Sequence, residues 1–377
     1  MTGNWQLNLD RAAFLTDYWQ RKPLLIRNAS EGFTPALSSD HLAGLAMEGE
    51  VESRLIEQRG NDWRLQHGPF AEADFARDHP WTLLVQAVDH YIPEVADLQR
   101  LFDFIPRWRM DDVMVSYAVD GGSVGPHYDN YDVFLLQGEG QRLWRLGQRC
   151  DNSSALLPHD ELRILHDFEV SEEYLLSPGD ILYVPPGIAH WGIAQGECTT
   201  FSIGFRAPLI NELLSRWTDQ LLLQIEDEQF YSDPGRAPAT QPGEIHTSDI
   251  KQVLAQLHHA LDQSVGNQWF GELITEPSYD VEPDQDELAS AQDLLHDGAE
   301  SVALSPAAKL AWHKEKNGLT IFANGESLAC GQSALPSLLI LCDRRALTGA
   351  HLHKALADSA TTILLERLLQ IGCLYVE

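Results

Sequence analysis

Apolar positions change their spacing twice along this chain of 377 residues. Between about Asp111 and Arg206, short apolar runs alternate with turns that contain Gly or Pro, as where Ser177-Pro178-Gly179-Asp180 precedes Ile181-Leu182-Tyr183-Val184. Short strands separated by such turns are typical of an antiparallel barrel or jelly roll. We therefore expect the middle of the chain to form a β-structured core.

The first hundred residues predict mostly helix with some strand. Ser38 is suited to cap a helix that runs through Leu42, because its hydroxyl can accept a backbone N–H of the first turn. Residues 81–88 alternate only weakly between apolar and polar, and we interpret them as the opening of another helix. We expect a largely helical N-terminal part, residues 1–107, followed by a β-structured core at residues 108–207.

Beyond residue 207 the apolar spacing becomes helical, first at residues 213–225 and again at residues 253–261. Residues 276–300 carry nine acidic residues and no Lys or Arg, which predicts an exposed linker. The remaining residues mix helix with short strands, as a small winged-helix-like unit would. We expect a helical segment at 208–275, and a linker with this C-terminal unit at 276–377.

Composition and cysteine usage favour a globular cytoplasmic protein. Hydrophobic residues make up 44% and aromatic residues 9%, which gives ample material for a core. No apolar run is long enough to cross a bilayer, and the first residues lack the basic flank and apolar stretch of an export signal. Five cysteines that are never spaced as CxxC argue against a disulfide framework or a zinc knuckle.

The formal net charge of −30 at pH 7 changes the choice of partners. A field this negative repels nucleic-acid phosphates and anionic membranes, so we expect neither direct nucleic-acid binding nor membrane association. It attracts a basic protein. Plain solubility explains the same charge, so composition alone does not name a partner.

Three side chains of the kind that bind transition metals are spaced suggestively. His127 and Asp129 are two positions apart, so on a strand they point to the same side. His190 follows a later apolar strand and can supply a second imidazole. Two imidazoles and one carboxylate on one face of a metal leave positions open, as in non-haem Fe(II) oxygenases. His159 and His166 remain alternatives for the third ligand.

Longer motifs surround these three residues. They are Tyr18-Trp19-Gln20-Arg21-Lys22-Pro23-Leu24, Trp108-Arg109-Met110-Asp111-Asp112, Gly125-Pro126-His127-Tyr128-Asp129-Asn130-Tyr131-Asp132-Val133-Phe134, Gln137-Gly138 with Arg142 and Trp144, and Pro185-Pro186-Gly187 before His190. With these motifs the chain resembles the JmjC-type ribosomal oxygenases, specifically the bacterial branch that hydroxylates an arginine of a large-subunit ribosomal protein. The resemblance runs in order along the whole chain and is most specific between Trp108 and Arg206.

The resemblance implies an α+β fold with a double-stranded β-helix core of the jelly-roll or cupin kind. N-terminal mixed helices would precede this JmjC-type core, which would complete a catalytic domain at residues 1–207. The helical segment 208–275 would serve dimerisation, and the C-terminal unit would be a winged-helix-like domain. A homodimer is therefore expected, although the helical spacing alone is equally that of a core helix.

The same resemblance implies the metal and its cosubstrates. His127, Asp129 and His190 would hold Fe(II), and 2-oxoglutarate and O₂ would be consumed there. Arg142 would bind the distal carboxylate of 2-oxoglutarate, which a guanidinium can contact through two parallel hydrogen bonds. Met114 and Ser116 would line the same pocket.

The implied activity is that of a 2-oxoglutarate-dependent dioxygenase that hydroxylates arginine and releases succinate and CO₂. Asp112, Tyr131 and Ser202 would contact the target side chain, and the partner would be a basic ribosomal protein in the cytoplasm. A histidine hydroxylase of a ribosomal protein, a lysine demethylase and a non-catalytic metal-binding cupin scaffold remain alternatives. The sequence leaves open the target arginine and carbon, the role of the C-terminal domain and the metal bound.

Overall fold

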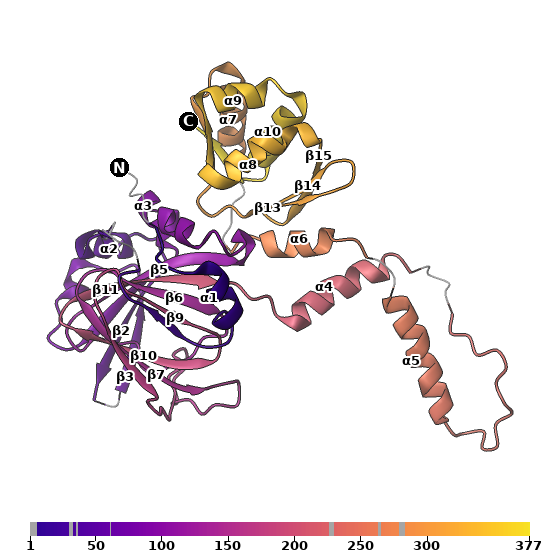
Figure 1. Ribbon diagram of the computed structural model, residues 1–377, viewed down its shortest axis with the longest axis horizontal. Coiled ribbons are helices and arrows are strands. Elements are labelled where there is room, and N and C mark those ends of the chain that lie inside the picture. The colour runs from indigo at the N-terminus through magenta and orange to yellow at the C-terminus, as the bar shows by residue number, and fades with distance from the viewer. Residues whose placement is uncertain are drawn as a thin grey trace. The chain divides into compact units, whose positions relative to one another are not determined.

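The structure is a computed structural model in which residues 6–29, 33–34, 37–60, 62–225, 230–262, 265–278 and 283–377 are described. The first five residues, which the sequence analysis interprets as lacking an export signal, lie outside them. The chain divides into two compact units, Met1–Ala207 and Pro208–Glu377, which are coloured indigo to rose and salmon to yellow in Figure 1. Each unit has a hydrophobic core of its own.

The first unit is mainly β-structure with short helices. Its elements in chain order are α1 (Arg11–Asp17), β1 (Leu24–Ile26), α2 (Ser39–Ala46), β2 (Ser53–Arg59), β3 (Asp62–His67), η1 (Glu72–Phe75), β4 (Trp81–Val85), η2 (Val88–His90), α3 (Pro93–Ala96), η3 (Asp97–Phe102), η4 (Arg107–Arg109), β5 (Met110–Ala118), β6 (Asp132–Gln137), β7 (Gln141–Arg149), β8 (Glu172–Leu176), β9 (Ile181–Val184), β10 (Ile188–Gln195) and β11 (Cys198–Phe205).

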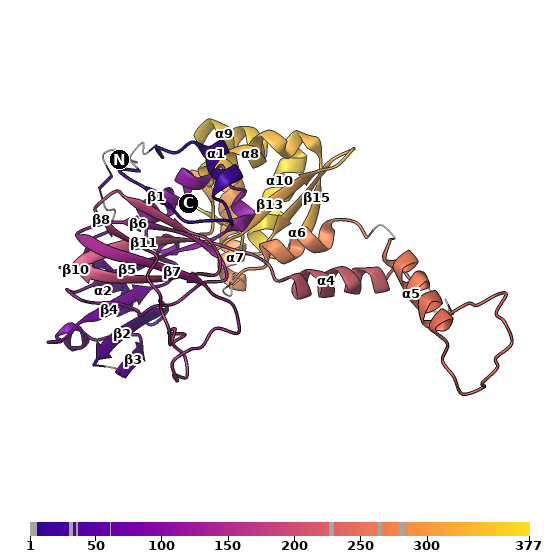
Figure 2. The same cartoon turned by 60° about the horizontal axis from the view of Figure 1, so that its bottom comes forward.

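Two antiparallel sheets form the core of this unit. The larger has the strand order β1-β9-β6-β11-β5-β4-β2-β3 and the smaller the order β10-β7-β8, and strands of both are labelled in Figure 2. Leu135 and Leu182 of the larger sheet pack against Trp144 and Leu176 of the smaller sheet. Because alternate residues of a strand point to opposite faces, every second residue of these strands faces the space between the sheets.

Helices cover the opposite face of the larger sheet. Phe14 of α1 and Leu42 of α2 belong to the same buried cluster as Val113 and Phe134, which point away from the smaller sheet. The ring of Phe14 lies 5.5 Å from that of Phe134, measured between centroids. The outer face of the larger sheet is therefore sealed by apolar packing.

The N-terminal part contains more strand than the sequence predicts. The helix capped by Ser38 is confirmed, since the Ser38 hydroxyl accepts the backbone N–H of His41 at the start of α2. The helix expected at residues 81–88 is wrong, because Trp81–Val85 forms β4 inside the larger sheet. All five residues of β4 are buried. A strand that is covered on both faces carries a continuous apolar run, which periodicity cannot separate from a buried helix.

The second unit combines helices with two small sheets. Its elements are α4 (Ile210–Leu222), α5 (Thr247–Leu261), α6 (Gln268–Thr275), α7 (Gln285–Asp297), β12 (Ser301–Leu304), β13 (Leu310–Lys314), β14 (Leu319–Ala323), β15 (Glu326–Cys330), η5 (Gln332–Ala334), α8 (Leu335–Arg344), β16 (Ala346–Thr348), α9 (Gly349–Leu356), α10 (Ser359–Gln370) and β17 (Leu374–Val376). The sheets have the orders β16-β12-β17 and β13-β14-β15.

The helical spacing beyond residue 207 is confirmed by α4 and α5, although α4 ends at Leu222 and leaves out the last positions expected in it. The acidic stretch at residues 276–300 differs from the exposed linker that its charge predicts. Residues Gln285–Asp297 instead form α7, whose Leu295 is buried in the core of the second unit. Among the described residues, no helix has both the length and the hydropathy to cross a membrane.

Candidate metal centre and active site

His127 and Asp129 lie in the segment before β6, and they meet His190, which is on β10. One ligand atom from each lies within 4.8 Å of the other two, and Nε2 of His190 is 3.5 Å from Oδ2 of Asp129. The backbone aligns the two histidines, because the N–H of His127 donates to the His190 carbonyl and the N–H of His190 donates to the His127 carbonyl. Across the residues that the structure describes, no other cluster of His, Cys, Asp and Glu has this metal-binding geometry.

Both imidazoles are prepared for metal binding. Nδ1 of His127 lies 3.0 Å from the Gly125 carbonyl, and Nδ1 of His190 lies 3.0 Å from the Ile188 carbonyl. Since a carbonyl only accepts, Nδ1 carries the proton in each ring and Nε2 keeps its lone pair for a metal. Burial, helped by the neighbouring His127, lowers the pKa of His190 to about 4, so that this ring is neutral near pH 7. The donor set therefore fits a divalent transition metal.

Gly125 allows the chain to turn into this position. Its φ of +83° belongs to the left-handed region, and a Cβ there would lie 3.1 Å from the Trp63 ring and 3.2 Å from Ile164. A side chain at this position would be strained in its backbone and crowded by both neighbours. His127 thus depends on a glycine two residues before it.

The two alternative histidines are not part of the group. Nδ1 of His159 accepts the backbone N–H groups of Glu161 and Leu162, and Nδ1 of His166 lies 3.0 Å from the Asp167 carboxylate. Neither joins His127, Asp129 and His190 in the metal-type cluster.

Arg142 of β7 reaches across the space between the sheets. Its Nη1 donates to the Ser116 hydroxyl of β5 over 3.3 Å, and its Nε donates to Sγ of Cys198 over 3.4 Å. The side chain is 3% exposed, and its Nη2 has no hydrogen-bond partner among the described residues. A buried cation without a carboxylate is costly, so this arrangement fits a bound anion.

A second buried donor lies beside Arg142. Nε1 of Trp144 also has no hydrogen-bond partner among the described residues. The Trp144 ring centroid is 5.9 Å from Cζ of Arg142 and 5.8 Å from the His190 ring centroid. The indole is therefore close to both the buried Arg142 and the metal ligand His190. Such an interior fits an elongated dianion with one end at Arg142 and the other at the metal.

Strand register places the other expected cosubstrate residues on the same inner face. Ser116 faces the interior through its bond to Arg142, and Met114, two positions earlier on β5, therefore faces it too. Ser202 of β11 is the direct cross-strand partner of Met114. Met114 packs with Leu84 in a small apolar cluster, so it offers a hydrophobic wall.

Asp112 lies near the beginning of β5, and its charge acts on Tyr131, as does that of Asp129. Its Oδ2 accepts a hydrogen bond of 2.6 Å from Nε2 of Gln86 and one of 2.9 Å from the N–H of Ala87. Oε1 of Gln86 accepts in turn from Nη2 of Arg54 over 3.1 Å. The carboxylate expected to receive the substrate is thus already held by groups from the N-terminal strands.

Tyr131 belongs to the same neighbourhood. Burial raises the pKa of its phenol, the negative charges of Asp129 and Asp112 raise it further, and the positive charge of Arg54 opposes them. The phenol therefore stays protonated at neutral pH and can donate a hydrogen bond. Its side chain is 44% exposed, which places it at the border between the interior and solvent.

Sequence reasoning missed Arg54, Gln86 and the unpaired donor of Trp144. Gln86 lies within residues 81–88, which the sequence analysis interprets as helix, and Arg54 lies far from the metal motifs in sequence. Their common position follows from the pairing of β2 with β4 and of β4 with β5. No signal in the sequence reports that pairing. Trp144 was noted only as part of a motif.

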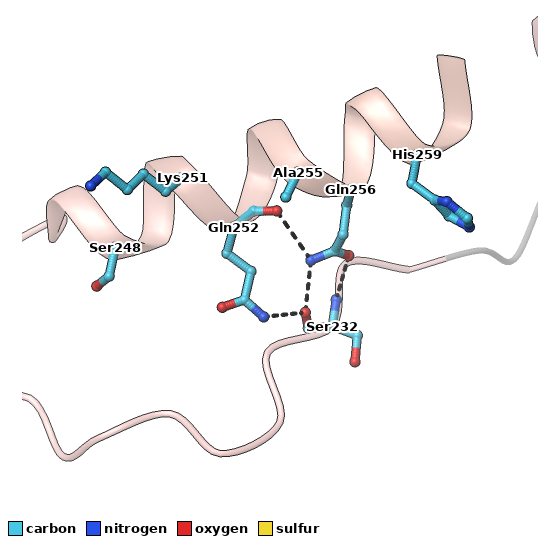
Figure 3. A pocket seen from close by; sticks show the side chains of 7 residues that line it. All are labelled: Ser232, Ser248, Lys251, Gln252, Ala255, Gln256 and His259. Carbon is cyan, nitrogen blue, oxygen red and sulfur yellow. Dashed lines mark hydrogen bonds between the residues drawn. The ribbon is translucent and has the colours of Figure 1, made fainter. Parts of the chain in front are cut away.

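The second unit has a hollow of a different character on α5, shown in Figure 3. It is lined by Ser232, Ser248, Lys251, Gln252, Ala255, Gln256 and His259. Nε2 of Gln252 and Nε2 of Gln256 both donate to the Ser232 carbonyl, which ties a loop to the polar face of the helix. These are structural contacts, and the hollow offers no group comparable to the metal cluster.

Comparison with known proteins agrees with this geometry. A JmjC domain model matches residues 97–213, a ROXA-like winged-helix model matches residues 255–375, and an AraC-like ligand-binding domain model matches residues 170–276. The chain is 35% identical over 378 residues to a ribosomal protein uL16 3-hydroxylase of Escherichia coli, with 99% of each chain covered.

Solved structures of a ribosomal oxygenase are also similar to this chain over nearly its full length. The ribosomal oxygenase YcfD of Escherichia coli in complex with cobalt and 2-oxoglutarate is 34% identical, with a TM-score of 0.81 and 99% of both chains covered. The complex of YcfD with cobalt and succinic acid has the same identity, TM-score and coverage.

A jelly roll that carries two histidines and one aspartate at the end of its strands defines a cupin-type metal-dependent oxygenase. Within that class, the chain belongs to the bacterial JmjC-type ribosomal oxygenases. The α+β fold expected from the sequence, with a JmjC-type core and a C-terminal winged-helix domain, is confirmed.

Proposed function

We propose that this protein is a 2-oxoglutarate- and Fe(II)-dependent dioxygenase that hydroxylates an arginine side chain of the ribosomal protein uL16. The observation that carries the proposal is a His–Asp–His group of metal-binding geometry beside a buried arginine whose Nη2 lacks a hydrogen-bond partner among the described residues. The near-complete coverage of the uL16 3-hydroxylase supports the choice of substrate. Succinate and CO₂ are the expected co-products.

Fe(II) would be held by Nε2 of His127, Nε2 of His190 and a carboxylate oxygen of Asp129. When bound there, the iron supplies the oxidising chemistry that couples decarboxylation of 2-oxoglutarate to insertion of oxygen into a C–H bond. The protein orients both imidazoles through their Nδ1 contacts with the Gly125 and Ile188 carbonyls. Mn, Co or Ni would fit the same donors, so the choice of iron rests on the reaction and not on the ligands.

Arg142 would bind the distal carboxylate of 2-oxoglutarate, with Ser116 and Met114 lining that end of the site. Its Nε and Nη1 are held by Cys198 and Ser116, which fixes the guanidinium plane and leaves Nη2 for the ligand. A guanidinium is suited to this position because it stays protonated when buried and binds a carboxylate in a fixed geometry.

Asp112, Tyr131 and Ser202 would contact the target side chain. A substrate guanidinium requires a carboxylate, which Asp112 supplies, and the aromatic wall and hydrogen-bonding group of Tyr131 suit its flat shape. Ser202 is 9% exposed and lies on the inner face of β11. The formal charge of −30 would help to draw the basic substrate to the protein.

The test is to incubate the protein with Fe(II), 2-oxoglutarate and purified uL16 and to measure the intact mass of the product. A gain of one oxygen atom, which fragment ions assign to an arginine, is the expected result. Oxygen on a histidine would show the same machinery with a different substrate. Release of formaldehyde would indicate demethylation. If the mass of uL16 does not change and no succinate forms, the non-catalytic scaffold would be favoured.

We further propose a cytoplasmic homodimer with three parts: a catalytic domain at 1–207, a helical dimerisation segment at 208–275 and a linker with a winged-helix domain at 276–377. The division after Ala207 supports the first boundary. The winged-helix match begins before the second boundary, at residue 255, so limited proteolysis followed by mass spectrometry should locate it.

A further inference from the structure

A chain of hydrogen bonds connects two N-terminal strands to the carboxylate proposed to receive the substrate. Arg54 of β2 donates to Oε1 of Gln86, which follows β4, and Nε2 of Gln86 donates to Oδ2 of Asp112 on β5. These contacts fix the orientation of the Gln86 amide, because its oxygen must face the guanidinium and its nitrogen must face the carboxylate. The positive charge of Arg54 is thus linked to Asp112 through one amide.

The same oxygen of Asp112 receives a second donor from a strained turn. The N–H of Ala87 donates to Oδ2 over 2.9 Å, and Ala87 has φ +50° and ψ +40°. A left-handed conformation is unfavourable for a residue with a Cβ, and such strain is often found at functional sites. Two donors on one oxygen hold the carboxylate in one orientation.

We propose that Gln86 is a positioning residue that, held by Arg54, fixes the Asp112 carboxylate for the guanidinium of the substrate and so contributes to selectivity for a cationic side chain. This inference rests on the substrate role proposed above for Asp112. A carboxylate that is already oriented accepts a planar guanidinium without losing further rotational freedom, which favours substrate binding. Arg54 also acts electrostatically on Tyr131, which places it at the same end of the strands.

A purely structural role would make Gln86 necessary for docking the segment that follows β4. That segment has other anchors, because Oδ1 of Asp89 accepts the N–H of Val113 over 2.8 Å and Val88 is fully buried. The bond from the Ala87 N–H to Asp112 is also made by backbone. Removing the Gln86 amide should therefore leave the segment in place and remove only the hydrogen bond that orients the Asp112 carboxylate.

The central experiment replaces Gln86 by Leu and by Glu. Gln86→Leu keeps much of the volume but removes both hydrogen bonds, and Gln86→Glu keeps the contact with Arg54 but cannot donate to Asp112. We expect both variants to raise the KM for uL16 about tenfold, as for loss of a hydrogen bond to a charged group, with a much smaller change in kcat. Calorimetric titration of uL16 into the protein loaded with Co(II) and 2-oxoglutarate should show the same loss of affinity.

A matched control is Gln58→Leu. Gln58 lies near the other end of β2, where its amide donates to the Gly60 carbonyl in an exposed hairpin, and this variant should leave the KM for uL16 unchanged. Arg54→Leu should reproduce part of the Gln86→Leu effect. An unchanged KM in Gln86→Leu, or a lowered melting temperature with equal losses in all kinetic parameters, would overturn the positioning role.

A double-mutant cycle separates this inference from the proposed function. If Gln86 acts through Asp112, then Gln86→Leu should hardly raise the KM for uL16 further in a protein that already carries Asp112→Asn. If the fold-changes in KM of the two single variants instead multiply in the double variant, Gln86 acts independently of Asp112. That result would overturn the inference while Asp112 keeps its role. If Asp112→Asn alone leaves the KM for uL16 unchanged, the substrate contact is wrong and the inference fails with it. Absence of any product on uL16 in the unmodified protein would instead contradict the proposed function.

Discussion

At the scale of single residues, the metal group makes the sharpest prediction. His127→Ala should abolish succinate formation and hydroxylation, because two ligands cannot hold the metal as three do. It should leave the melting curve of the metal-free protein nearly unchanged, since His127 is only partly buried. Titration with Co(II), followed by visible absorption, measures the loss of metal binding directly.

The control for that variant is His166→Ala, which removes a histidine that contacts Asp167 outside the metal group. It should retain both metal binding and turnover. Turnover at the level of the unmodified protein in His127→Ala would refute the assignment of the three ligands.

Arg142 supplies a second prediction at this scale. Arg142→Ala should raise the 2-oxoglutarate concentration needed for half-maximal turnover strongly, because removing one partner of a buried charge pair costs about 2–5 kcal/mol. Arg142→Lys should recover only part of the affinity, since an ammonium cannot replace the fixed fork of the guanidinium. Equilibrium binding of 2-oxoglutarate in the presence of Co(II) measures the effect without turnover.

Arg145 is the matched control, because it lies on the same strand with the opposite orientation and pairs with the exposed Glu173. Arg145→Ala should leave the 2-oxoglutarate requirement unchanged. An unchanged requirement in Arg142→Ala would move the anchor for the distal carboxylate to another residue.

At the scale of secondary-structure elements, the pairing of β7 with β10 determines where the Trp144 ring lies. Gly192 of β10 is the cross-strand partner of Trp144, and a Cβ at Gly192 would lie 2.8 Å from the ring. Gly192→Ala should therefore push the indole toward the space between Arg142 and His190 and weaken 2-oxoglutarate binding. The change in tryptophan fluorescence on addition of 2-oxoglutarate and Co(II) is a suitable measure.

Gly196→Ala is the control for this substitution in the metal-loaded protein. Gly196 follows β10 and has open space around its Cα, although its φ of +72° means that an alanine there carries some backbone strain. That strain should lower stability slightly without changing 2-oxoglutarate binding. If Gly192→Ala binds 2-oxoglutarate as the unmodified protein does, the ring can shift without reaching the site.

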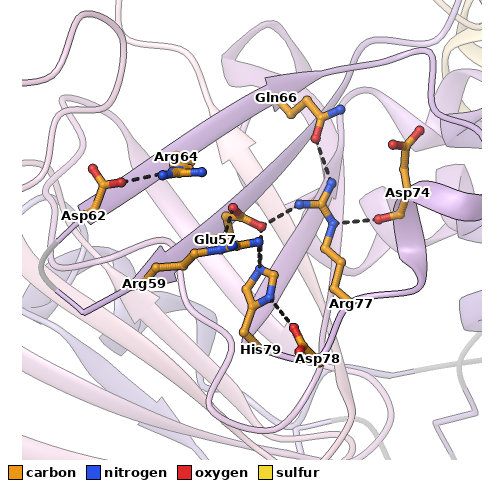
Figure 4. Close-up of polar contacts among 9 residues, drawn as sticks. All are labelled: Glu57, Arg59, Asp62, Arg64, Gln66, Asp74, Arg77, Asp78 and His79. Carbon is orange, nitrogen blue, oxygen red and sulfur yellow. Dashed lines mark hydrogen bonds and ion pairs between the residues drawn. The ribbon is translucent and has the colours of Figure 1, made fainter.

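A buried carboxylate joins β2 to the segment before β4. Glu57 of β2 accepts hydrogen bonds from Nη1 of Arg77 and from Nε2 of His79, both over 2.5 Å, and Arg59 lies within ion-pair distance (Figure 4). Burial on its own would raise the pKa of Glu57, but the bonds from His79 and Arg77 outweigh it and lower the pKa below the ordinary value of 4.5. The folded state therefore binds a proton at Glu57 less readily than the unfolded state does.

This linkage predicts the sign of a pH effect on stability. The contribution of Glu57 is fully present above its unfolded pKa of about 4.5 and is lost as the pH falls through the lower folded pKa. Glu57→Gln should cost about 1.5–3 kcal/mol at neutral pH, because it weakens hydrogen bonds to a charged group. Below pH 4 the gap between the two proteins should narrow, which thermal unfolding at several pH values would measure.

Glu161→Gln is the exposed counterpart of that variant. Glu161 also pairs with a histidine, His67, but both side chains are more than half exposed. Screening by solvent limits such a pair to about 0–1 kcal/mol, so this variant should be nearly neutral at every pH. A gap between Glu57→Gln and the unmodified protein that stays constant from neutral pH to below pH 4 would show that Glu57 is not the titrating group.

At the scale of the whole molecule, α4 and α5 carry apolar side chains that nothing in the described chain covers. On α5, Ile250, Val253, Leu254, Leu257 and Leu261 are 41–53% exposed and recur at helical spacing, and no residue of this helix is buried. Ile210 and Leu214 of α4 are 78% and 57% exposed. A helix gains most of its stability by burying one face, so these apolar stripes support the homodimer proposed above.

Leu254→Glu together with Leu257→Glu should therefore shift the protein from dimer to monomer in sedimentation-velocity experiments. The cause is the cost of burying two carboxylates in an apolar interface. Lys251→Glu on the polar face of α5, where Figure 3 shows Lys251 beside Ser248, is the control and should remain dimeric. A monomeric unmodified protein would contradict the proposed dimer.

The sequence by itself determined the local features of this protein. The two-residue spacing of His127 and Asp129 fixes their common side on any strand, and the Gly- and Pro-containing turns divide the chain from Asp111 to Arg206 into strands. Capping at Ser38 and the helical spacing within α5 are likewise local, since each depends on residues within a few positions of one another. The motifs around these residues were sufficient to indicate the family and its fold.

Only the tertiary structure decided which distant residues meet. It showed that residues 81–85 form a buried strand, that α7 lies in the acidic stretch, and that Arg54, Gln86 and Asp112 join at one end of the larger sheet. The physical reason is that side-chain alternation encodes the face of a strand but not its neighbour. The order of strands in a sheet results from packing over the whole chain, and no short segment carries that information.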